Sequence, residues 1–269
     1  MDELKTKAKV IRKHIINATT EAGSGHPTSS LSGVEIGVAL YFGGLMRYDA
    51  QKPDFPDRDR FILSKGHAAP LLYALLAEAG YFSSDQILTL RKLGSPLEGH
   101  PNTRRLPGVE ASTGSLGQGL SLGLGHALVG KMSGRKFHTY VMLGDGEIGE
   151  GQVWEAAMAA TKYRTDNLTA IIDQNGYQQT GSTEEVLDLQ PLRPKWESFG
   201  WRVQEINGND MEEAYNALKK TQEVEGQPSV IIASTVKGWP IQDVLSEQNH
   251  HGKPLSKEEA DKALELIGA

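Results

Sequence analysis

Two apolar runs near the middle of the chain each end in a short polar segment. Residues 140–143 stop at Gly-Asp-Gly (144–146), and residues 168–172 stop at Asp-Gln-Asn (173–175). The segment between them repeats larger or apolar residues at the spacing of one helix face: Trp154, Ala157, Met158 and Thr161. This order predicts a strand, a helix and a second, parallel strand joined by a right-handed crossover. Both strand ends then meet at the sheet edge where open α/β folds bind ligands.

An acid and an amide follow these two strands, Asp145 after the first and Asn175 after the second. Their oxygens are hard ligands, suited to a magnesium or calcium ion that keeps some positions for phosphate oxygens. Gly144 and Gly146 allow a bulky anion to approach the backbone closely. Because Gly-Asp-Gly alone is also a common turn, the prediction depends on its combination with the helix and the later Asn. Together these features predict a metal and phosphate site.

The composition excludes several classes of protein. With 269 residues, 23% charged and 38% hydrophobic, the chain resembles an ordinary globular protein, and it has neither repeats nor an obvious linker. We therefore expect a single domain over residues 1–269. The net charge of −6 gives no reason to expect nucleic acid or an acidic membrane surface as a partner. The lack of cysteines excludes disulfides and thiolate chemistry. No apolar run approaches a membrane span and the start is too charged for a secretory signal, which predicts a cytoplasmic protein.

Strands and helices alternate along the chain, as in an α/β fold with a mainly parallel sheet flanked by helices. Strands are expected at 61–63, 201–206 and 229–236, in addition to the two above. Helices are expected at 4–22, 33–42, after His67 to Ala79, 84–93, 116–132, 191–199 and 210–223, and after the capping box of Ser256 and Glu259, with Gly268 as the stop. Glycines within the helix at 116–132 indicate close packing against another backbone: Gly119, Gly123 and Gly125.

Four of the eight histidines lie in loops rich in Gly or Pro: His26, His67, His100 and His251. Three others fall within helix or strand patterns and are expected to be structural: His14, His126 and His138. None of the four loop histidines shows the close spacing of a zinc enzyme. Because histidine gives or takes a proton near neutral pH, these loops instead predict proton transfer and hydrogen bonding to an oxygen-rich substrate.

The segments around these residues resemble a known family. GDGEIGEGQVWEAA at 144–157 with IIDQN at 171–175 resembles the thiamine diphosphate motif, in which an Asn follows the Asp of Gly-Asp-Gly by about thirty positions. Four further segments are similar to transketolases specifically: SGHPTSSLS at 24–32, SKGHAAPLLYALLAEAGYF at 64–82, LEGHPN at 97–102 and STGSLGQGLSLGLG at 112–125. The resemblance extends to residues 251–255 and matches the N-terminal, diphosphate-binding half of a transketolase. It implies the three-layer thiamine diphosphate-binding fold and the N-terminal subunit of a split enzyme.

The resemblance implies a metal site and a cofactor site. Asp145 and Asn175 would bind Mg²⁺ through their side chains and Tyr177 through its backbone carbonyl, with Ca²⁺ or Mn²⁺ as substitutes. Backbone groups that would meet the diphosphate and aminopyrimidine of thiamine diphosphate belong to Gly114, Leu116, Gly144 and Gly146. This cofactor supplies a carbon nucleophile and an electron sink, while the protein orients the reactants and transfers protons.

The histidines and two glutamates also acquire roles through the resemblance. The diphosphate would be contacted by His67 and His251. The catalytic histidines, which meet the sugar hydroxyls and carbonyl near the thiazolium ring, would be His26, His100 and His251. Glu150 and Glu155 match acids that lie between paired active sites, at a subunit interface. Glu150 is equally explained as a favourable negative charge in the first turn of a helix.

The implied activity is the transfer of a two-carbon glycolaldehyde unit from a ketose phosphate to an aldose phosphate, as in the pentose phosphate pathway. The glutamate that activates the aminopyrimidine and the cations that hold the substrate phosphate belong to the other half of the family's chain. We therefore expect a C-terminal, pyrimidine-binding partner subunit, an α2β2 heterotetramer, and no activity of this chain alone.

Alternative functions remain open at this point. They are a subunit like deoxyxylulose-phosphate synthase or the α chain of 2-oxo-acid dehydrogenases, or a non-catalytic module that binds a magnesium diphosphate. The Gly-His-Pro segments at 25–27 and 99–101 argue against the first two. The chain departs from the family pattern at Thr28, Gln174, residues 178–181 and residues 239–240. These departures leave the donor specificity undetermined and do not touch the metal residues.

Overall fold

The structure, a computed structural model, describes residues 1–245 and 250–268. Its centre is a sheet of five parallel strands in the order β1-β2-β3-β5-β4. The strands are β1 (Arg60–Leu63), β2 (Thr139–Gly144), β3 (Leu168–Gln174), β4 (Arg202–Asn207) and β5 (Ser229–Ser234). In the register of β2 with β3, Gly144 lies beside Asp173. The turns that follow the two strands therefore begin next to each other, as the sequence predicts.

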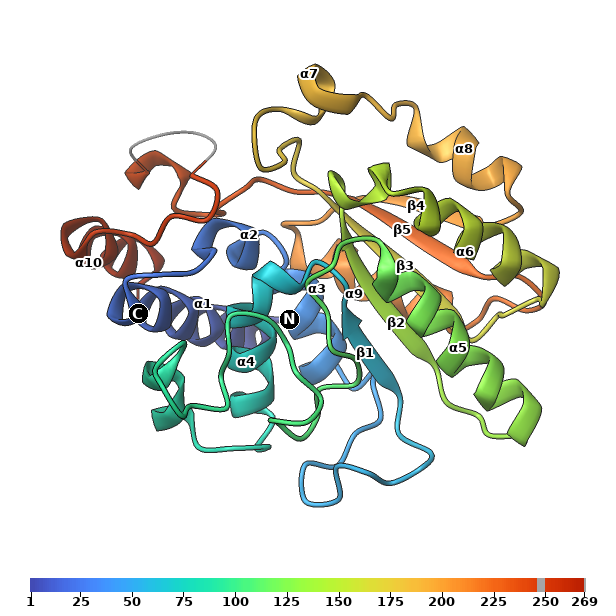
Figure 1. The fold of residues 1–269 in the computed structure, drawn as a ribbon, viewed down its shortest axis with the longest axis horizontal. Helices are drawn as coiled ribbons and strands as arrows, with labels where there is room; N and C mark the ends of the chain where they lie inside the picture. Colours follow the sequence, from blue (N-terminus) through green and yellow to red (C-terminus); the bar gives the residue numbers. More distant parts are fainter. Residues whose placement is uncertain (246–249, 269) are drawn as a thin grey trace.

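Helices cover both faces of this sheet, so the predicted three-layer α/β fold is confirmed (Figure 1). One face carries α5 (Gln118–Ser133), α6 (Gly151–Lys162) and α8 (Leu192–Ser198). The other carries α1 (Asp2–Ala22), α3 (Val34–Phe42), α4 (Ala69–Glu78) and α9 (Met211–Thr221). The remaining helices are α2 (Pro27–Leu31), α7 (Thr183–Leu187) and α10 (Lys257–Ile267). Single 3₁₀ segments lie at Gly66–Ala68, Ser84–Thr89, Glu147–Gly149 and Gln242–Val244.

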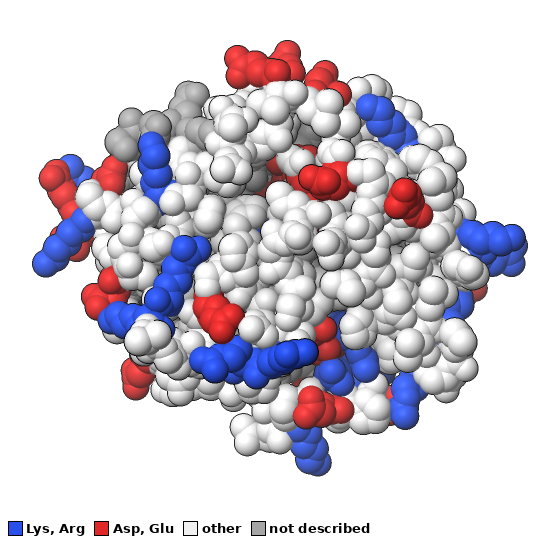
Figure 2. Space-filling model, viewed as in Figure 1, with Lys and Arg blue, Asp and Glu red and all other residues white. Residues whose placement is uncertain are grey.

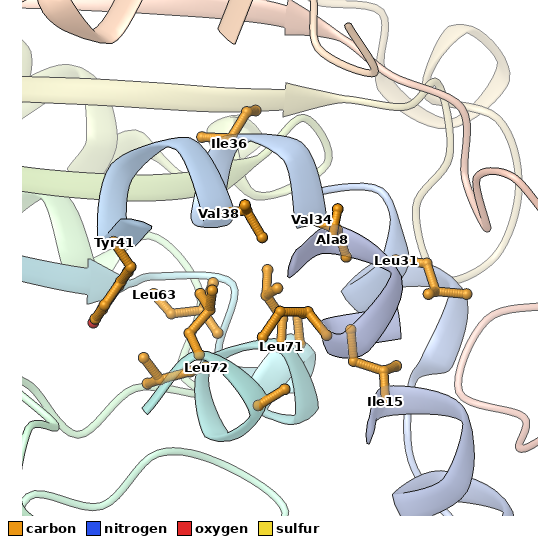
Figure 3. Close-up of a cluster of buried hydrophobic side chains, with 14 of the residues drawn as sticks. Ala8, Ile15, Leu31, Val34, Ile36, Val38, Tyr41, Leu63, Leu71 and Leu72 are labelled. Atoms are coloured by element: carbon orange, nitrogen blue, oxygen red, sulfur yellow. The ribbon is translucent and has the colours of Figure 1, made fainter. Parts of the chain in front are cut away.

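Each helical layer has its own hydrophobic core against the sheet. Figure 3 shows part of the larger one, where α1, α3 and α4 direct aliphatic side chains such as Ile15, Val38 and Leu72 toward one another. In the other layer, Leu120 of α5 and Val153 of α6 are fully buried with the residues of β2 and β3. Burying a side chain of this size contributes about 1.5–3 kcal/mol relative to leaving it exposed. The strands that end at the candidate site are thus held from both sides.

Most predicted elements occur with boundaries shifted by a few residues, and two predictions are wrong. The expected helix at 84–93 is only the 3₁₀ segment Ser84–Thr89, because the backbone of Leu90 is not helical (ψ 127°) and that of Arg91 is left-handed (φ 59°), neither of which continues a helix. The glycines of α5 also differ. A methyl group at Gly119 would collide with Ser64, just after β1, and one at Gly123 with Val141 of β2, whereas one at Gly125 would meet no atom of the described residues within 4 Å. Gly125 lies on the outer, solvent-exposed face of α5.

The described helices include none that is both long enough and apolar enough to cross a membrane.

Candidate active site

The turn after β2 places Asp145 at the carboxyl edge of the sheet with only 7% of its surface exposed. One carboxylate oxygen accepts a hydrogen bond from the backbone N–H of Gly146 (2.9 Å), and the other accepts one from Gly176 (2.6 Å), beyond β3. Burial, followed by the charge of Asp173, raises the pKa of Asp145 to about 6. The carboxylate is thus fixed in position by two backbone donors, in surroundings where a nearby cation would favour its charged form.

Residues from distant segments surround one cavity of about 640 Å³ next to Asp145. Of the residues that the sequence singles out, the following line it: His26, His67, His100, Gly114, Leu116, Gly144, Asp145, Gly146, Glu150, Asn175, Tyr177 and His251. Asn175 accepts a hydrogen bond from the backbone of Tyr177 (3.1 Å), which closes the turn after β3. Glu155 does not line the cavity and is exposed on α6. The edge predicted from the strand ends therefore coincides with the place where the four loop histidines meet.

The histidines form a compact group on one side of the cavity. The ring centroid of His26 lies 5.0 Å from that of His67 and 5.1 Å from that of His251, and the latter two are 5.3 Å apart. His100 packs over Gly114, where an added Cβ would come within 2.9 Å of the imidazole ring. Because Gly114 also has a left-handed backbone, only glycine fits there without strain.

The imidazoles of this group are neutral at pH 7. Burial is the main reason: it lowers the pKa of His26 and of His251 to about 4, and that of His67 well below its usual range. Nearby cations add to the effect, Arg91 at His26 and Lys237 at His251. Neutral imidazoles can both donate and accept hydrogen bonds, which suits contacts with hydroxyl and carbonyl oxygens.

Lys237 determines which nitrogen of His251 carries the hydrogen. Its ammonium nitrogen lies 3.0 Å from Nδ1 of His251, and its own pKa is lowered to about 8, mainly by burial. At pH 7 the ammonium form donates to Nδ1, so the hydrogen of the neutral imidazole is on Nε2. His251 can then donate that hydrogen to a ligand oxygen.

Two charged residues of the site were missed by the sequence reasoning. Lys65, at the end of β1, lines the cavity and forms a fully buried ion pair with Asp173 of β3. Glu147 accepts hydrogen bonds from the backbone of Gly117 (2.9 Å) and Gly144 (3.0 Å), tying the loop before α5 to the end of β2. The sequence signal that could have found them is a charged residue within three positions of the end of a buried strand. Their partners, however, lie far away in sequence.

A pH dependence of folding stability follows from the depressed histidine pKa values. Between pH 6.5 and pH 4 the unfolded chain binds protons at His26 and His251 that the folded chain does not. The stability that the folded chain gains from keeping these two histidines neutral is therefore intact above pH 6.5 and is lost as the pH falls toward 4. In urea titrations at pH 7.5 and pH 5, we expect the midpoint of the H26Q/H251Q variant to fall less than that of the wild type. Equal losses in both proteins would contradict the assignment.

Comparison with known proteins identifies the family. The family model described as "Transketolase, thiamine diphosphate binding domain" matches residues 4–269. The chain belongs to the transketolase family. This confirms the resemblance seen in the sequence, and with it the thiamine diphosphate-binding character of the domain.

Transketolases of two lengths are similar to the chain. It is 45% identical to bovine "Transketolase-like protein 2", covering 98% of this chain and 42% of that one. It is 44% identical to an apulose-4-phosphate transketolase subunit of Actinobacillus succinogenes, covering 99% and 96%. The transketolase of Campylobacter jejuni superposes with a TM-score of 0.94 at 31% identity, covering all of this chain and 43% of that one. The chain thus spans less than half of the long relatives and nearly all of the short one.

Proposed function

We propose that this chain is the diphosphate-binding subunit of a two-chain transketolase, which transfers a glycolaldehyde unit from a ketose phosphate to an aldose phosphate. The observation that carries the proposal is that one cavity at the ends of β2 and β3 is lined by the Gly-Asp-Gly turn, Asn175 and four histidines. Relatives of about the same length support the two-chain form, because their names describe them as subunits. We further propose that residues 1–269 act as one domain.

The residues present fit thiamine diphosphate. The cavity, about 640 Å³, is of the size that ligands of this kind occupy. Opposite sides of the cavity approach each other closely at a glycine: a methyl group on Gly146 would lie 2.6 Å from Cβ of Gln178. Beyond β1, His67 provides a hydrogen-bonding ring for the diphosphate, and Lys65 supports the cavity wall through its bond to the carbonyl of Ser29. When bound, the cofactor supplies the carbon nucleophile and electron sink of the reaction.

A magnesium ion would be held by the side chains of Asp145 and Asn175 and the carbonyl of Tyr177, and would help to bind the diphosphate. Within the described residues no group of three or more His, Cys, Asp or Glu side chains could hold a metal. A site of one carboxylate and neutral oxygens would leave positions for phosphate oxygens. Ca²⁺ or Mn²⁺ would bind through the same oxygens.

The histidines then act on the sugar. His26 and His100 are placed to hydrogen-bond the hydroxyl and carbonyl oxygens of the substrate, and His251 to donate through Nε2. As neutral imidazoles they can take up a proton from a sugar hydroxyl and return it, which the cleavage and the transfer of the two-carbon unit both require. These roles assign the residues that contact substrate, and they leave the preferred sugar pair to be measured.

The surface over α5 and α6 is the proposed face for the partner chain. Figure 2 shows a broad area over these helices with almost no Lys, Arg, Asp or Glu. Exposed apolar side chains lie on the same helices: Leu122, Val129, Met132 and Met158. Glu150, which lines the cavity, and Glu155, which is exposed on α6, lie at the junction of this face and the site. Two copies of each chain would give the α2β2 assembly, in the cytoplasm.

Activity measurements test this proposal directly. With thiamine diphosphate, Mg²⁺, xylulose 5-phosphate and ribose 5-phosphate, we expect the chain alone to give no turnover, because half of the cofactor site is supplied by the partner. Adding the pyrimidine-binding chain from the same genome is expected to restore it. Turnover by the lone chain comparable to a full-length transketolase would contradict the split site. Turnover with pyruvate in place of the ketose phosphate would favour the deoxyxylulose-phosphate synthase alternative. Cofactor binding without turnover in the mixture would favour the non-catalytic module.

A further inference from the structure

Arg91 has a backbone conformation that its residue type rarely adopts. Its φ of 59° lies in the left-handed region, where Gly and Asn are the usual occupants because a Cβ atom crowds the backbone. Its N–H donates to the carbonyl of Leu97 (2.8 Å), which closes a tight loop just before the segment that carries His100. An arginine in this position indicates that the side chain contributes something that Gly or Asn cannot.

The guanidinium of Arg91 lies between two histidine loops. On one side Nη1 donates a hydrogen bond to Oγ of Ser24 (2.8 Å), two residues before His26. On the other side it packs against the backbone of Gly99, next to His100, where an added Cβ would be only 3.0 Å from Cζ. The absence of a side chain at Gly99 is thus what makes room for the guanidinium.

We propose that Arg91 is a positioning residue that holds the loops of His26 and His100 at a fixed separation at the rim of the cavity. The inference rests on the proposed role of these two histidines in binding the sugar. The clamp contacts neither the diphosphate end of the cavity nor the metal residues. Its loss therefore affects the alignment of the substrate and leaves cofactor binding intact.

The charge of Arg91 acts on the same two imidazoles. After burial, it is the strongest influence that lowers the pKa of both His26 and His100. His26 also faces His100 and Lys237, whereas the depressed pKa values of His67 and His251 arise from burial, from Lys65 and Lys237, and from the neighbouring histidines. Arg91 thus adds to the effect of burial at His26 and His100 and reaches the other two rings only through these neighbours.

A purely structural role explains the arrangement less well. The ion pair of the adjacent Lys92 with Glu21 (2.8 Å) and the bond from Arg91 to Ser24 are both solvent-exposed, and exposed contacts contribute little to folding stability. The packing of the guanidinium against Gly99 therefore sets the geometry of the loop more than its stability. Arg91 thus has a costly backbone conformation without a compensating gain in folding stability. This combination is expected where a side chain has a role in a functional site.

Comparison of three variants tests the proposal: R91N, R91K and, as the matched control, K92A. Asn tolerates the left-handed backbone, so R91N should keep or raise the urea midpoint. In the reconstituted enzyme it should lower kcat by about 10- to 100-fold, the range for misaligned reacting groups, with unchanged affinity for thiamine diphosphate. NMR titration of the chain alone should show raised pKa values for His26 and His100 and smaller changes at His67 and His251. R91K should retain the histidine pKa values but not the full kcat, and K92A should change neither.

A second substitution keeps the test independent of the transketolase assignment. G99A places a methyl group where the guanidinium packs, so the NMR signals of His26 and His100 in the chain alone should shift as they do in R91N. In the R91N background the same G99A change should have almost no further effect, because the group it displaces is gone. The proposed positioning role of Arg91 would be overturned if the effects of the two substitutions were additive. It would also be overturned if the histidine titrations of R91N matched those of the wild type. An R91N variant whose urea midpoint falls together with kcat would show a structural role instead.

Discussion

Replacing Asp145 with asparagine is expected to abolish magnesium-dependent binding of thiamine diphosphate. The carboxylate offers an oxygen to each of two backbone donors, Gly146 and Gly176, and still has lone pairs for a metal. An asparagine must turn its NH₂ group toward one of these donors and loses the negative charge. Changes in the outer shell of a metal site typically cost 10- to 100-fold in affinity, so loss of a direct ligand should exceed about 100-fold. Calorimetric titration of thiamine diphosphate, with Mg²⁺ and with chelator, measures the difference.

The folding of the D145N variant separates a metal site from an ordinary turn. Burial and the charge of Asp173 disfavour the ionised form of Asp145, which offsets the hydrogen bond that the amide loses, so the urea midpoint of the metal-free chain should stay close to that of the wild type. D261N, an exposed substitution on α10, is the matched control and should bind normally. If the urea midpoint of D145N falls so far that unfolding explains the lost binding of thiamine diphosphate, Asp145 belongs to the turn alone.

The sequence predicts Asp145 and Asn175 well because their proximity depends only on strand direction. Each follows a buried apolar run, and parallel pairing brings the two runs into register. The convergence of the loop histidines is different. His26, His100 and His251 come from loops without periodicity, so no local pattern predicts that they meet. Their Gly- and Pro-rich loops mark them as candidates, and the family resemblance assigns them to one site.

The errors and omissions have a common physical cause: they depend on tertiary partners. Whether a helix glycine faces a neighbour is a property of the packed structure, and Gly125 faces none among the described residues. Glu147 reads as a surface acid in sequence, yet its role is to accept the N–H of Gly117, thirty residues earlier. Lys65 likewise owes its position to Asp173, more than a hundred residues away. Such pairs cannot be found from spacing alone.

The buried pair of Lys65 and Asp173 leads to the largest expected change in stability. Both side chains are almost completely excluded from solvent, at 1% and 0% exposure. Asp173 also accepts hydrogen bonds from Ser32 and Thr235, and Lys65 donates to the carbonyl of Ser29 (2.7 Å). Removing one partner of such a pair leaves an uncompensated buried charge, which typically costs about 3–5 kcal/mol. D173N should therefore lower the free energy of unfolding by about this amount in urea titrations at pH 7.

The double variant K65M/D173N distinguishes the structural from the functional value of the pair. Methionine keeps the bulk of Lys65 without its charge, and the amide introduced by D173N can still bond to Ser32 and Thr235, so the double variant should regain most of the stability lost in D173N. If Lys65 is only the counterion of Asp173, thiamine diphosphate should bind the double variant as it binds the wild type. Because Lys65 lines the cavity, we expect instead a stable protein that binds the cofactor more weakly. Regained stability together with weaker cofactor binding would show that the Lys65–Asp173 pair, through the bond of Lys65 to Ser29, shapes the wall of the cavity and is not needed for folding stability.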